Sequence, residues 1–370
     1  MYRIVSVRLE DVRIHESFVL KPADGVTLLR GPNGSGKTSV LEAITLGLTL
    51  RPLHGGRAGD LVRRNAPRAR ITLELEADTL RSRVVVDLWP AGRLQAWIDG
   101  RKVKSSGEFV ERFAVTTFVP DDLALVAGAP DGRRRFMDAV MVQMWPALTE
   151  TRRRFERALR QRNSLLRQAR AGIGRELIQE LRVWEERLAA EAHRLAEARA
   201  ELVAELSAPV TEEYRSIAGH DVAVGLTYSP DWVREGLRSR LESVRAEEIA
   251  RGATLYGPHR DDLEVTIAGL PARTHASQGE RRTLALAMKI AAHVSVAARR
   301  GSAPVLLLDD VFSELDEARS ERLLRALPRG QTILTSAGSV PEGWDPESVV
   351  ELSGPTSTRG SEEPLVAALP

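Results

Sequence analysis

The loop Gly31–Thr38, GPNGSGKT, has the residue types and the spacing that bind the phosphates of a nucleotide. It fits the pattern G-x-x-x-x-G-K-[ST] and stands between an apolar run at Val26–Arg30 and a helical pattern over Ser39–Leu50. Glycines permit the turn that points successive backbone N–H groups at the β-phosphate, Lys37 would bridge the β- and γ-phosphates, and the Thr38 hydroxyl would ligate Mg²⁺. The alternative is a glycine-rich turn that binds no ligand, but such a turn would require neither the apolar run before it nor the helical pattern after it. The predicted nucleotide-binding residues are Gly31, Pro32, Asn33, Gly34, Ser35, Gly36, Lys37 and Thr38.

Two adjacent carboxylates follow a second apolar run. Val305–Leu308 is typical of a buried parallel strand, and Asp309 and Asp310 come directly after it. An Asp at the end of such a strand holds Mg²⁺, and a second carboxylate can orient the water that attacks the γ-phosphate. We therefore predict Asp309 as a metal ligand together with Thr38, and Asp310 and Lys37 as catalytic residues. The alternative is that the two carboxylates only cap the strand.

A third stretch, 277–280 (SQGE), begins a helical pattern over Arg281–Ala297 and precedes Asp309 in the sequence. A Gly after a polar pair lets the N-terminus of a helix, which attracts anions, approach a ligand closely. The same residues also fit a capping box, with Ser277 as the N-cap and Glu280 at the third helical position. The two interpretations are compatible, and both stay open at this point.

This order of phosphate loop, Ser-x-Gly-x helix, apolar strand and 313–316 (SELD) resembles the ABC-type ATPases. The resemblance implies an α/β head of the P-loop NTPase class that binds ATP and Mg²⁺. It also implies that the residues of 277–280 contact the γ-phosphate bound by the opposite subunit, so that ATP completes a homodimer. On this resemblance the signature residues acting in trans are Ser277, Gln278, Gly279 and Glu280, the D-loop residues are Ser313 and Asp316, and the switch residues are Thr335 and Ser336.

Further segments resemble the RecF family of bacterial recombination mediators, whose heads are related to those of SMC proteins. They are 30–44 (RGPNGSGKTSVLEAI), 118–140 with 159–167 (LRQRNSLLR), and 256–265 (YGPHRDDLEV). The resemblance implies an ATP-dependent homodimer that binds double-stranded DNA and single-strand/duplex junctions at gaps and helps RecO and RecR load RecA. The rival hypothesis is the ATPase subunit of an ABC transporter without DNA binding. An inserted helical arm and a switch region that lacks His count against that rival.

Some positions depart from these patterns and bear on the rate of hydrolysis. Arg13 is kept from the family's Asn-Phe-Arg-Asn-Tyr segment and is expected near the nucleotide, whereas both aromatic positions are lost. Asp310 stands where transporters carry Glu, and Asp121 or Asp122 occupies the neighbourhood of a Gln that meets Mg²⁺. Since Asp is shorter than Glu by one methylene, Asp310 should place the attacking water less well. We therefore predict a weak ATPase, in which slow hydrolysis times the dissociation of the dimer.

The elements that position these residues form one α/β head interrupted by a helical insertion. Strands are predicted at Ile4–Leu9, Val26–Arg30, Ile71–Leu75, Val84–Leu88, Val115–Val119, Leu263–Ile267, Val305–Leu308 and Gln331–Thr335, with a hairpin turn at Asp99-Gly100 between Leu94–Ile98 and Lys102–Lys104. Leucines at 181, 188, 195 and 202 recur at seven-residue spacing on a helix of roughly 30 residues, which favours an antiparallel arm after a break at 171–174. A third helical stretch is predicted over Asp231–Arg251. The predicted units are a head of residues 1–145 and 254–352, a helical arm of 146–253 and a disordered tail of 353–370.

Composition and local charge restrict the other possibilities. A chain of 370 residues without Cys has no disulfide and no thiolate metal site, and without a long apolar run we expect a cytoplasmic protein with no membrane partner. Five of the 53 basic residues are Lys, which leaves 48 Arg, a bias that a GC-rich genome also produces. Two local clusters at the base of the arm are the predicted DNA contacts, with a merely solvated face as the alternative: Arg133, Arg134, Arg135, Arg152, Arg153 and Arg154. A metal site around His259 is less favoured than a simple turn, because only one imidazole is present.

Overall fold

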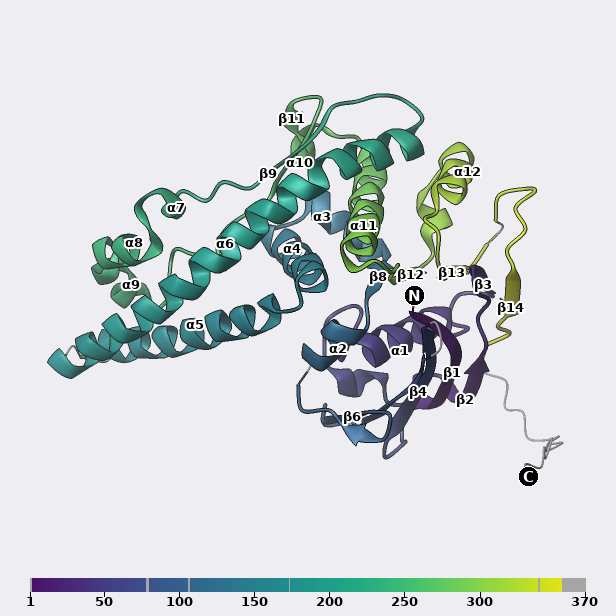
Figure 1. The fold of residues 1–370 in the computed structure, drawn as a ribbon, viewed down its shortest axis with the longest axis horizontal. Helices are drawn as coiled ribbons and strands as arrows, with labels where there is room; N and C mark the ends of the chain where they lie inside the picture. The colour runs from purple at the N-terminus through teal and green to yellow at the C-terminus, as the bar shows by residue number, and fades with distance from the viewer. Residues whose placement is uncertain (1, 78–79, 106, 173, 339, 355–370) are drawn as a thin grey trace.

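The computed structural model describes residues 2–77, 80–105, 107–172, 174–338 and 340–354. Figure 1 shows a strand-rich lobe next to the N-terminus, a long helical arm that extends to the opposite side, and a layer of helices between the two. The predicted disordered tail, 353–370, lies almost entirely outside the described residues, so its disorder stays a prediction.

The phosphate loop belongs to a parallel sheet of five strands in the order β14-β3-β13-β12-β8. The strands are β14 (Ser348–Glu351), β3 (Val26–Arg30), β13 (Thr332–Ser336), β12 (Val305–Leu308) and β8 (Val115–Phe118). All neighbouring pairs are parallel, and β12 is buried along its whole length, as its continuous apolar sequence predicts. The carboxyl ends of all five strands therefore meet at one edge of the sheet, where the phosphate loop and Asp309 follow β3 and β12.

A second, antiparallel sheet covers one face of this core. Its strands are β2 (His15–Leu20), β1 (Tyr2–Val12), β4 (Ala69–Ala77), β5 (Leu80–Leu88), β6 (Leu94–Ile98) and β7 (Arg101–Lys102), in that order. Helix α1 (Lys37–Thr49) joins side chains of both sheets in one apolar cluster, and η1 (Ala58–Leu61) and α2 (Gly107–Arg112) complete this lobe. Asp99 and Gly100 both have positive φ, 52° and 76°, which confirms the predicted hairpin turn between β6 and β7.

Helices cover the opposite face of the parallel sheet. They pack on Leu306, Leu308 and Leu334 in a second apolar cluster. The elements of this layer are η2 (Pro120–Leu123), α3 (Ala124–Ala127), α4 (Pro130–Met144), α10 (Ala272–His275), α11 (Gln278–Arg300), η3 (Val311–Glu314) and α12 (Glu317–Ala326). Helix α11 begins with the predicted signature residues and α12 begins directly after Asp316, so this layer connects both segments to the sheet.

The arm is an antiparallel pair of helices, α5 (Leu148–Ala171) and α6 (Arg175–Ala218). The four leucines of the predicted seam are at most 2% exposed. Helix α6 has 44 residues and continues through Pro209, so it is longer than the roughly 30 residues predicted and spans about 66 Å. Its first half packs on α5 and its second half on α11 and α12. The boundary between arm and head therefore lies inside α6, and a division at residue 146 and residue 253 does not separate two packed units.

The return from the arm differs from the single helix predicted over Asp231–Arg251. It consists of three short helices, α7 (Trp232–Glu235), α8 (Leu237–Ser243) and α9 (Arg245–Arg251). Gly236 has a φ of 82° between the first two, a conformation that no continuous helix contains. Before and after these helices, β9 (Val224–Thr227) pairs with β10 (Glu264–Ile267), which also pairs with β11 (Leu270–Pro271). The sequence patterns did not predict β2, β9, β11 or β14.

A candidate nucleotide site at the ends of three parallel strands

The phosphate loop turns at two glycines with positive φ, Gly34 at 81° and Gly36 at 92°. Gly36 is the N-cap of α1, so the loop ends at the amino end of a helix, which favours anions. The Lys37 ammonium lies across the loop and donates to the carbonyl oxygens of Gly31 and Pro32 at 2.6 and 2.9 Å. The loop therefore holds its cation on the side where a phosphate would bind.

Thr38 and Asp309 meet at the sheet edge. The Thr38 hydroxyl lies 3.0 Å from each carboxylate oxygen of Asp309, and the Thr335 hydroxyl of β13 donates to Asp309 Oδ1 at 2.7 Å. Asp309 is only 4% exposed, and this burial raises its pKa against the lowering effect of the hydrogen bonds from Thr335 and Thr38. The strand order places β13 between β3 and β12, which is why residues from three separate segments converge here.

The donor atoms fit Mg²⁺, which prefers oxygen ligands and binds through one or two carboxylates together with the phosphates of a substrate. Thr38 and Asp309 supply a hydroxyl and a carboxylate. Among the described residues no group of three or more His, Cys, Asp or Glu side chains could hold a metal on its own. Thr38 and Asp309 are thus the residues that would hold Mg²⁺, and they would do so in company with a nucleotide.

Asp310 adopts a left-handed backbone conformation, with φ 46° and ψ 38°. Its N–H donates to the Thr335 hydroxyl at 2.9 Å, so Thr335 contacts both carboxylate residues. The Asp310 carbonyl in turn accepts from the Ser313 hydroxyl at 2.8 Å. Asp and Asn tolerate this conformation better than longer side chains do, which gives a physical reason for Asp at this position.

The turn between β1 and β2 lies against the phosphate loop. His15 Nε2 is 3.2 Å from the Gly36 carbonyl oxygen, and burial lowers the pKa of His15. Arg13, predicted near the nucleotide, forms two hydrogen bonds to the buried Glu42 of α1 at 3.0 and 2.9 Å. The structure thus ties Arg13 to α1 and brings His15 to the loop, a contact that the sequence patterns did not predict.

The signature helix begins with the capping box that the sequence predicts. Ser277 Oγ accepts from the Glu280 N–H at 3.3 Å, and Glu280 accepts from the Ser277 N–H at 2.7 Å. A Cβ at Gly279 would lie 2.8 Å from Arg319 Nη1, and Arg319 pairs with Asp316 at 3.0 Å. Ser277, Gln278, Ser313 and Asp316 are all exposed. The signature and the D-loop therefore border one accessible surface, joined through Arg319.

Of the two acidic residues after β8, Asp122 has two partners for its carboxylate. It accepts from the Val119 N–H at 2.9 Å and pairs with Lys289 at 2.8 Å. The Asp121 side chain is 84% exposed and lies 3.7 Å from His54 Nδ1. Asp121 therefore has an exposed carboxylate with one imidazole neighbour, whereas the Asp122 carboxylate is held by Val119 and Lys289.

Comparisons with known proteins match this arrangement. The chain fits the family described as RecF/RecN/SMC N terminal domain over residues 3–337. It is 34% identical over 365 residues to the DNA replication and repair protein RecF of Kineococcus radiotolerans, an alignment that covers 92% of this chain and 93% of the relative. This chain belongs to the RecF family.

Solved structures agree with this family and with the fold. The recombination mediator protein RecF with ATP, described in the RecFOR pathway, is similar with a TM-score of 0.88 and 25% identity over 96% of each chain. An Smc head bound to the C-winged helix domain of ScpA is similar with a TM-score of 0.56 and 16% identity, over 95% of this chain and 94% of that chain. The head therefore has the ABC-type ATPase fold that RecF-family proteins share with SMC heads.

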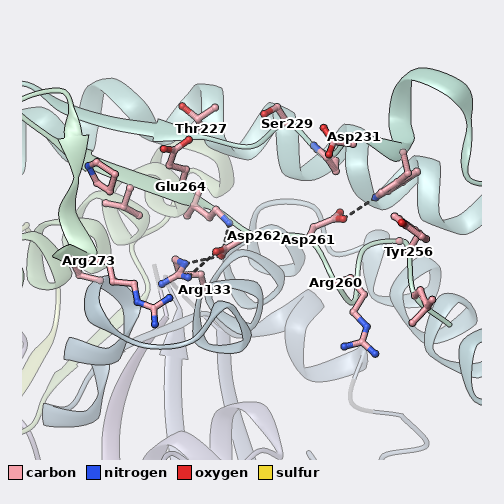
Figure 2. A pocket seen from close by; sticks show the side chains of 18 residues that line it. Arg133, Thr227, Ser229, Asp231, Tyr256, Arg260, Asp261, Asp262, Glu264 and Arg273 are labelled. Atoms are coloured by element: carbon pink, nitrogen blue, oxygen red, sulfur yellow. Dashed lines mark hydrogen bonds and ion pairs between the residues drawn. The ribbon is translucent and has the colours of Figure 1, made fainter. Parts of the chain in front are cut away.

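The predicted DNA-binding arginines divide into different environments. Arg133 is 4% exposed and forms two hydrogen bonds to Asp262 at 2.7 and 2.8 Å (Figure 2). Its assignment as a DNA contact is therefore wrong for this structure, because the guanidinium holds α4 against the segment before β10. The other five predicted arginines also have protein partners: Arg134 donates to the Asp261 carbonyl, Arg135 pairs with Asp131, Arg152 with Glu156, and Arg153 and Arg154 with Glu150.

The Tyr256–Leu263 segment forms a partly buried turn beside a cavity of about 600 Å³ (Figure 2). Asp261 accepts hydrogen bonds from the Tyr228 hydroxyl and the Trp232 indole at 2.6 and 2.8 Å. Burial lowers the pKa of His259 to about 4, and its Nε2 lies 3.1 Å from the Thr254 carbonyl oxygen. These contacts support the turn and not the metal hypothesis. None of the described helices combines the length and the apolar composition of a membrane span.

Proposed function

We propose that this chain is an ATP-dependent DNA-repair protein in which ATP closes two heads on each other and slow hydrolysis releases them. The observation that carries the proposal is the contact of Thr38 with both carboxylate oxygens of Asp309 at 3.0 Å. That contact joins the phosphate loop to the strand that must supply the Mg²⁺ ligand. The relative from Kineococcus radiotolerans carries the name DNA replication and repair protein, which agrees with this function.

In the proposed reaction each residue at the sheet edge has a separate task. The Lys37 ammonium leaves the loop carbonyls and binds the β- and γ-phosphates, while backbone N–H groups of the loop bind the β-phosphate. Thr38 and Asp309 would hold Mg²⁺, which would neutralise phosphate charge. Asp310 orients the water that attacks the γ-phosphate.

The second half of each site comes from the other subunit. Ser277 and Gln278 are exposed at the amino end of the 23-residue helix α11, where N–H groups and the helix dipole favour an anion. Ser313 and Asp316 are exposed on the surface that this helix end borders. A γ-phosphate bound in the partner's loop would be the anion, so dimerisation depends on ATP.

Slow turnover follows from the same geometry. Asp310 has a short side chain, and its backbone is fixed by the bond of its N–H to Thr335. Thr335 stands where ABC transporters usually carry the switch His, so no imidazole contacts the γ-phosphate from this strand. ATP therefore persists in the closed dimer, and hydrolysis acts as a timer.

The DNA substrate and the protein partners are proposed from the family. Gapped DNA with a single-strand/duplex junction is the proposed substrate, and RecO, RecR and RecA are the proposed partners. The structure of RecF with ATP is described in the RecFOR pathway, which supports this choice. No observation favours a transporter subunit.

Light scattering and DNA binding test the proposal together. Wild-type protein should dimerise on addition of ATP and Mg²⁺, and Ser277→Arg should stay monomeric while it still binds nucleotide. Gln179→Arg, which adds the same charge to an exposed position of α6, is the matched control and should dimerise normally. Equal dimerisation of wild type and Ser277→Arg, or a wild type that binds no gapped duplex, would contradict the proposal.

A further inference from the structure

The exposed face of α5 carries arginines that meet no acidic side chain. Arg157, Arg160 and Arg167, here called the arginine row, are all exposed. Within the described part of the chain none of the three has a hydrogen-bond or ion-pair partner. The sequence from Arg157 to Arg175 contains no Asp or Glu. The row therefore differs from the neighbouring Arg153, which pairs with Glu150 at 2.9 Å.

Helical geometry places the row on one side of the arm. At about 100° per residue, Arg157, Arg160 and Arg167 fall within a sector of about 80° and extend over about 15 Å of helix axis. The opposite side of α5 packs on α6 through Phe155 and Leu166, which are 5% and 0% exposed. Packing against α6 thus fixes the direction in which the row points.

The composition of this face favours the backbone of a nucleic-acid duplex. Guanidinium groups bind phosphates through a planar fork, and two exposed side chains next to the row, Gln161 and Gln168, can donate to phosphate oxygens. The exposed residues of α5 include no aromatic ring on which unpaired bases could stack, so this face lacks the means by which single strands are usually held. Duplex DNA carries about one negative charge per 1.7 Å of its axis, so a row of about 15 Å faces several phosphates.

The position of α5 in the molecule is compatible with binding a nucleic-acid duplex. In Figure 1, α5 lies along the edge of the arm on the side of the strand-rich lobe, whereas α7 and α8 lie on the other side of α6. Helix α5 packs along α6, and α6 reaches α11 and α12, the helices that follow the signature and the D-loop. The Arg322 guanidinium of α12 donates to the Ile217 carbonyl of α6 at 2.8 Å. A ligand on α5 therefore has a packed connection to the ATP-dependent surface.

We propose that the arginine row of α5 binds the phosphate backbone of double-stranded DNA, independently of sequence. The inference rests on the proposed DNA-binding function and gives that function a location away from the base of the arm. In this proposal the DNA contacts are no longer Arg133 and its neighbours, whose guanidinium groups are held by protein partners. They are the arginines of the row, which have no such partners among the described residues.

The test measures duplex affinity of the full chain at several salt concentrations, by fluorescence anisotropy with two labelled duplexes of unrelated sequence and with ATP present. The variant is Arg157→Gln with Arg160→Gln and Arg167→Gln. The matched control is Arg83→Gln with Arg93→Gln and Arg329→Gln, which removes three exposed arginines elsewhere. A third protein carries Lys at the three row positions and keeps their charge.

The row variant should bind both duplexes more weakly by the same factor, and the slope of log K against log salt should flatten by about 0.9 for each arginine, or about 2.7 in total. The control should keep the wild-type slope, and the Lys variant should recover most of it. A row variant with the wild-type slope, or a control that loses as much, would overturn the inference while leaving the proposed function intact. A wild type that binds no duplex would instead overturn the proposed function itself.

Discussion

The Thr38 hydroxyl lies 3.0 Å from both carboxylate oxygens of Asp309, although 271 positions separate the two residues in the sequence. The strand order explains the contact, because β13 lies between β3 and β12 and contributes Thr335 to the same cluster. The helical arm is inserted between the two halves of this site. The contact therefore forms only when the head has folded around the insertion, so the proposed Mg²⁺ site would exist only in the folded head.

Replacing Asp309 with Asn should stabilise the nucleotide-free protein. Burial raises the pKa of Asp309, so the folded state binds this proton more readily than the unfolded state. The contribution of this residue to stability is then greatest at low pH and falls as pH rises through the raised pKa. Thermal unfolding should place Asp309→Asn above the wild type at about pH 7.5, with a gap that narrows toward about pH 4.

The same variant should lose its response to the nucleotide. Adding Mg²⁺ and ATP should raise the unfolding temperature of the wild type and leave that of Asp309→Asn nearly unchanged, because binding to the folded state alone stabilises it. A wild type that is already as stable as Asp309→Asn near neutral pH would contradict the burial argument.

Asp310→Asn should separate ATP binding from hydrolysis. Asn tolerates the left-handed backbone at this position as Asp does, so the N–H bond to Thr335 should persist. Loss of the carboxylate should lower the rate of phosphate release by about 10²–10⁴-fold, while ATP still drives dimerisation. Asp231→Asn, on the exposed surface of the arm, is the control. Unchanged phosphate release from Asp310→Asn would remove Asp310 from the mechanism.

The arm should depend on a buried arginine. Arg162 is fully buried and donates to Thr254, Glu185 and Glu248 at 2.8, 3.0 and 2.5 Å. Arg162→Met would leave Glu248 buried without this charge partner, which typically costs about 3–5 kcal/mol. Urea unfolding followed by circular dichroism should show this loss, whereas Arg160→Met on the exposed face should change stability by less than about 0.5 kcal/mol. Equal midpoints for the two variants would show that the buried pair does not stabilise the arm.

The two strands that lead into the candidate nucleotide site could be predicted from the sequence, including their first and last residues. Val26–Arg30 and Val305–Leu308 are short apolar runs that end at a phosphate loop and at Asp309, so composition and neighbouring motif agree. The capping box at Ser277 was predictable for the same reason, because it is a local hydrogen-bond pattern.

Features that depend on distant packing were not predictable. Helix α6 passes Pro209 because Val210, Tyr214 and Ile217 beyond it are buried against the head, and this packing outweighs the missing N–H of proline. From the sequence, Arg133 is expected to be one of three exposed arginines. In the structure its guanidinium donates to Asp262, which lies 129 positions away in the sequence. Charge clusters in a sequence therefore indicate a nucleic-acid site only after the protein's own carboxylates have been placed.

If each ATP site is completed by the signature of the other subunit, two variants that are inactive for different reasons should restore each other's activity when mixed. Lys37→Ala disables its own phosphate loop but keeps Ser277, and Ser277→Arg keeps its loop but disables its signature. Neither variant alone should hydrolyse ATP above background. An equimolar mixture should regain phosphate release, because the heterodimer contains one intact composite site. A mixture that stays inactive while both proteins are folded, or Ser277→Arg alone with wild-type turnover, would rule out an ATP site shared between two subunits.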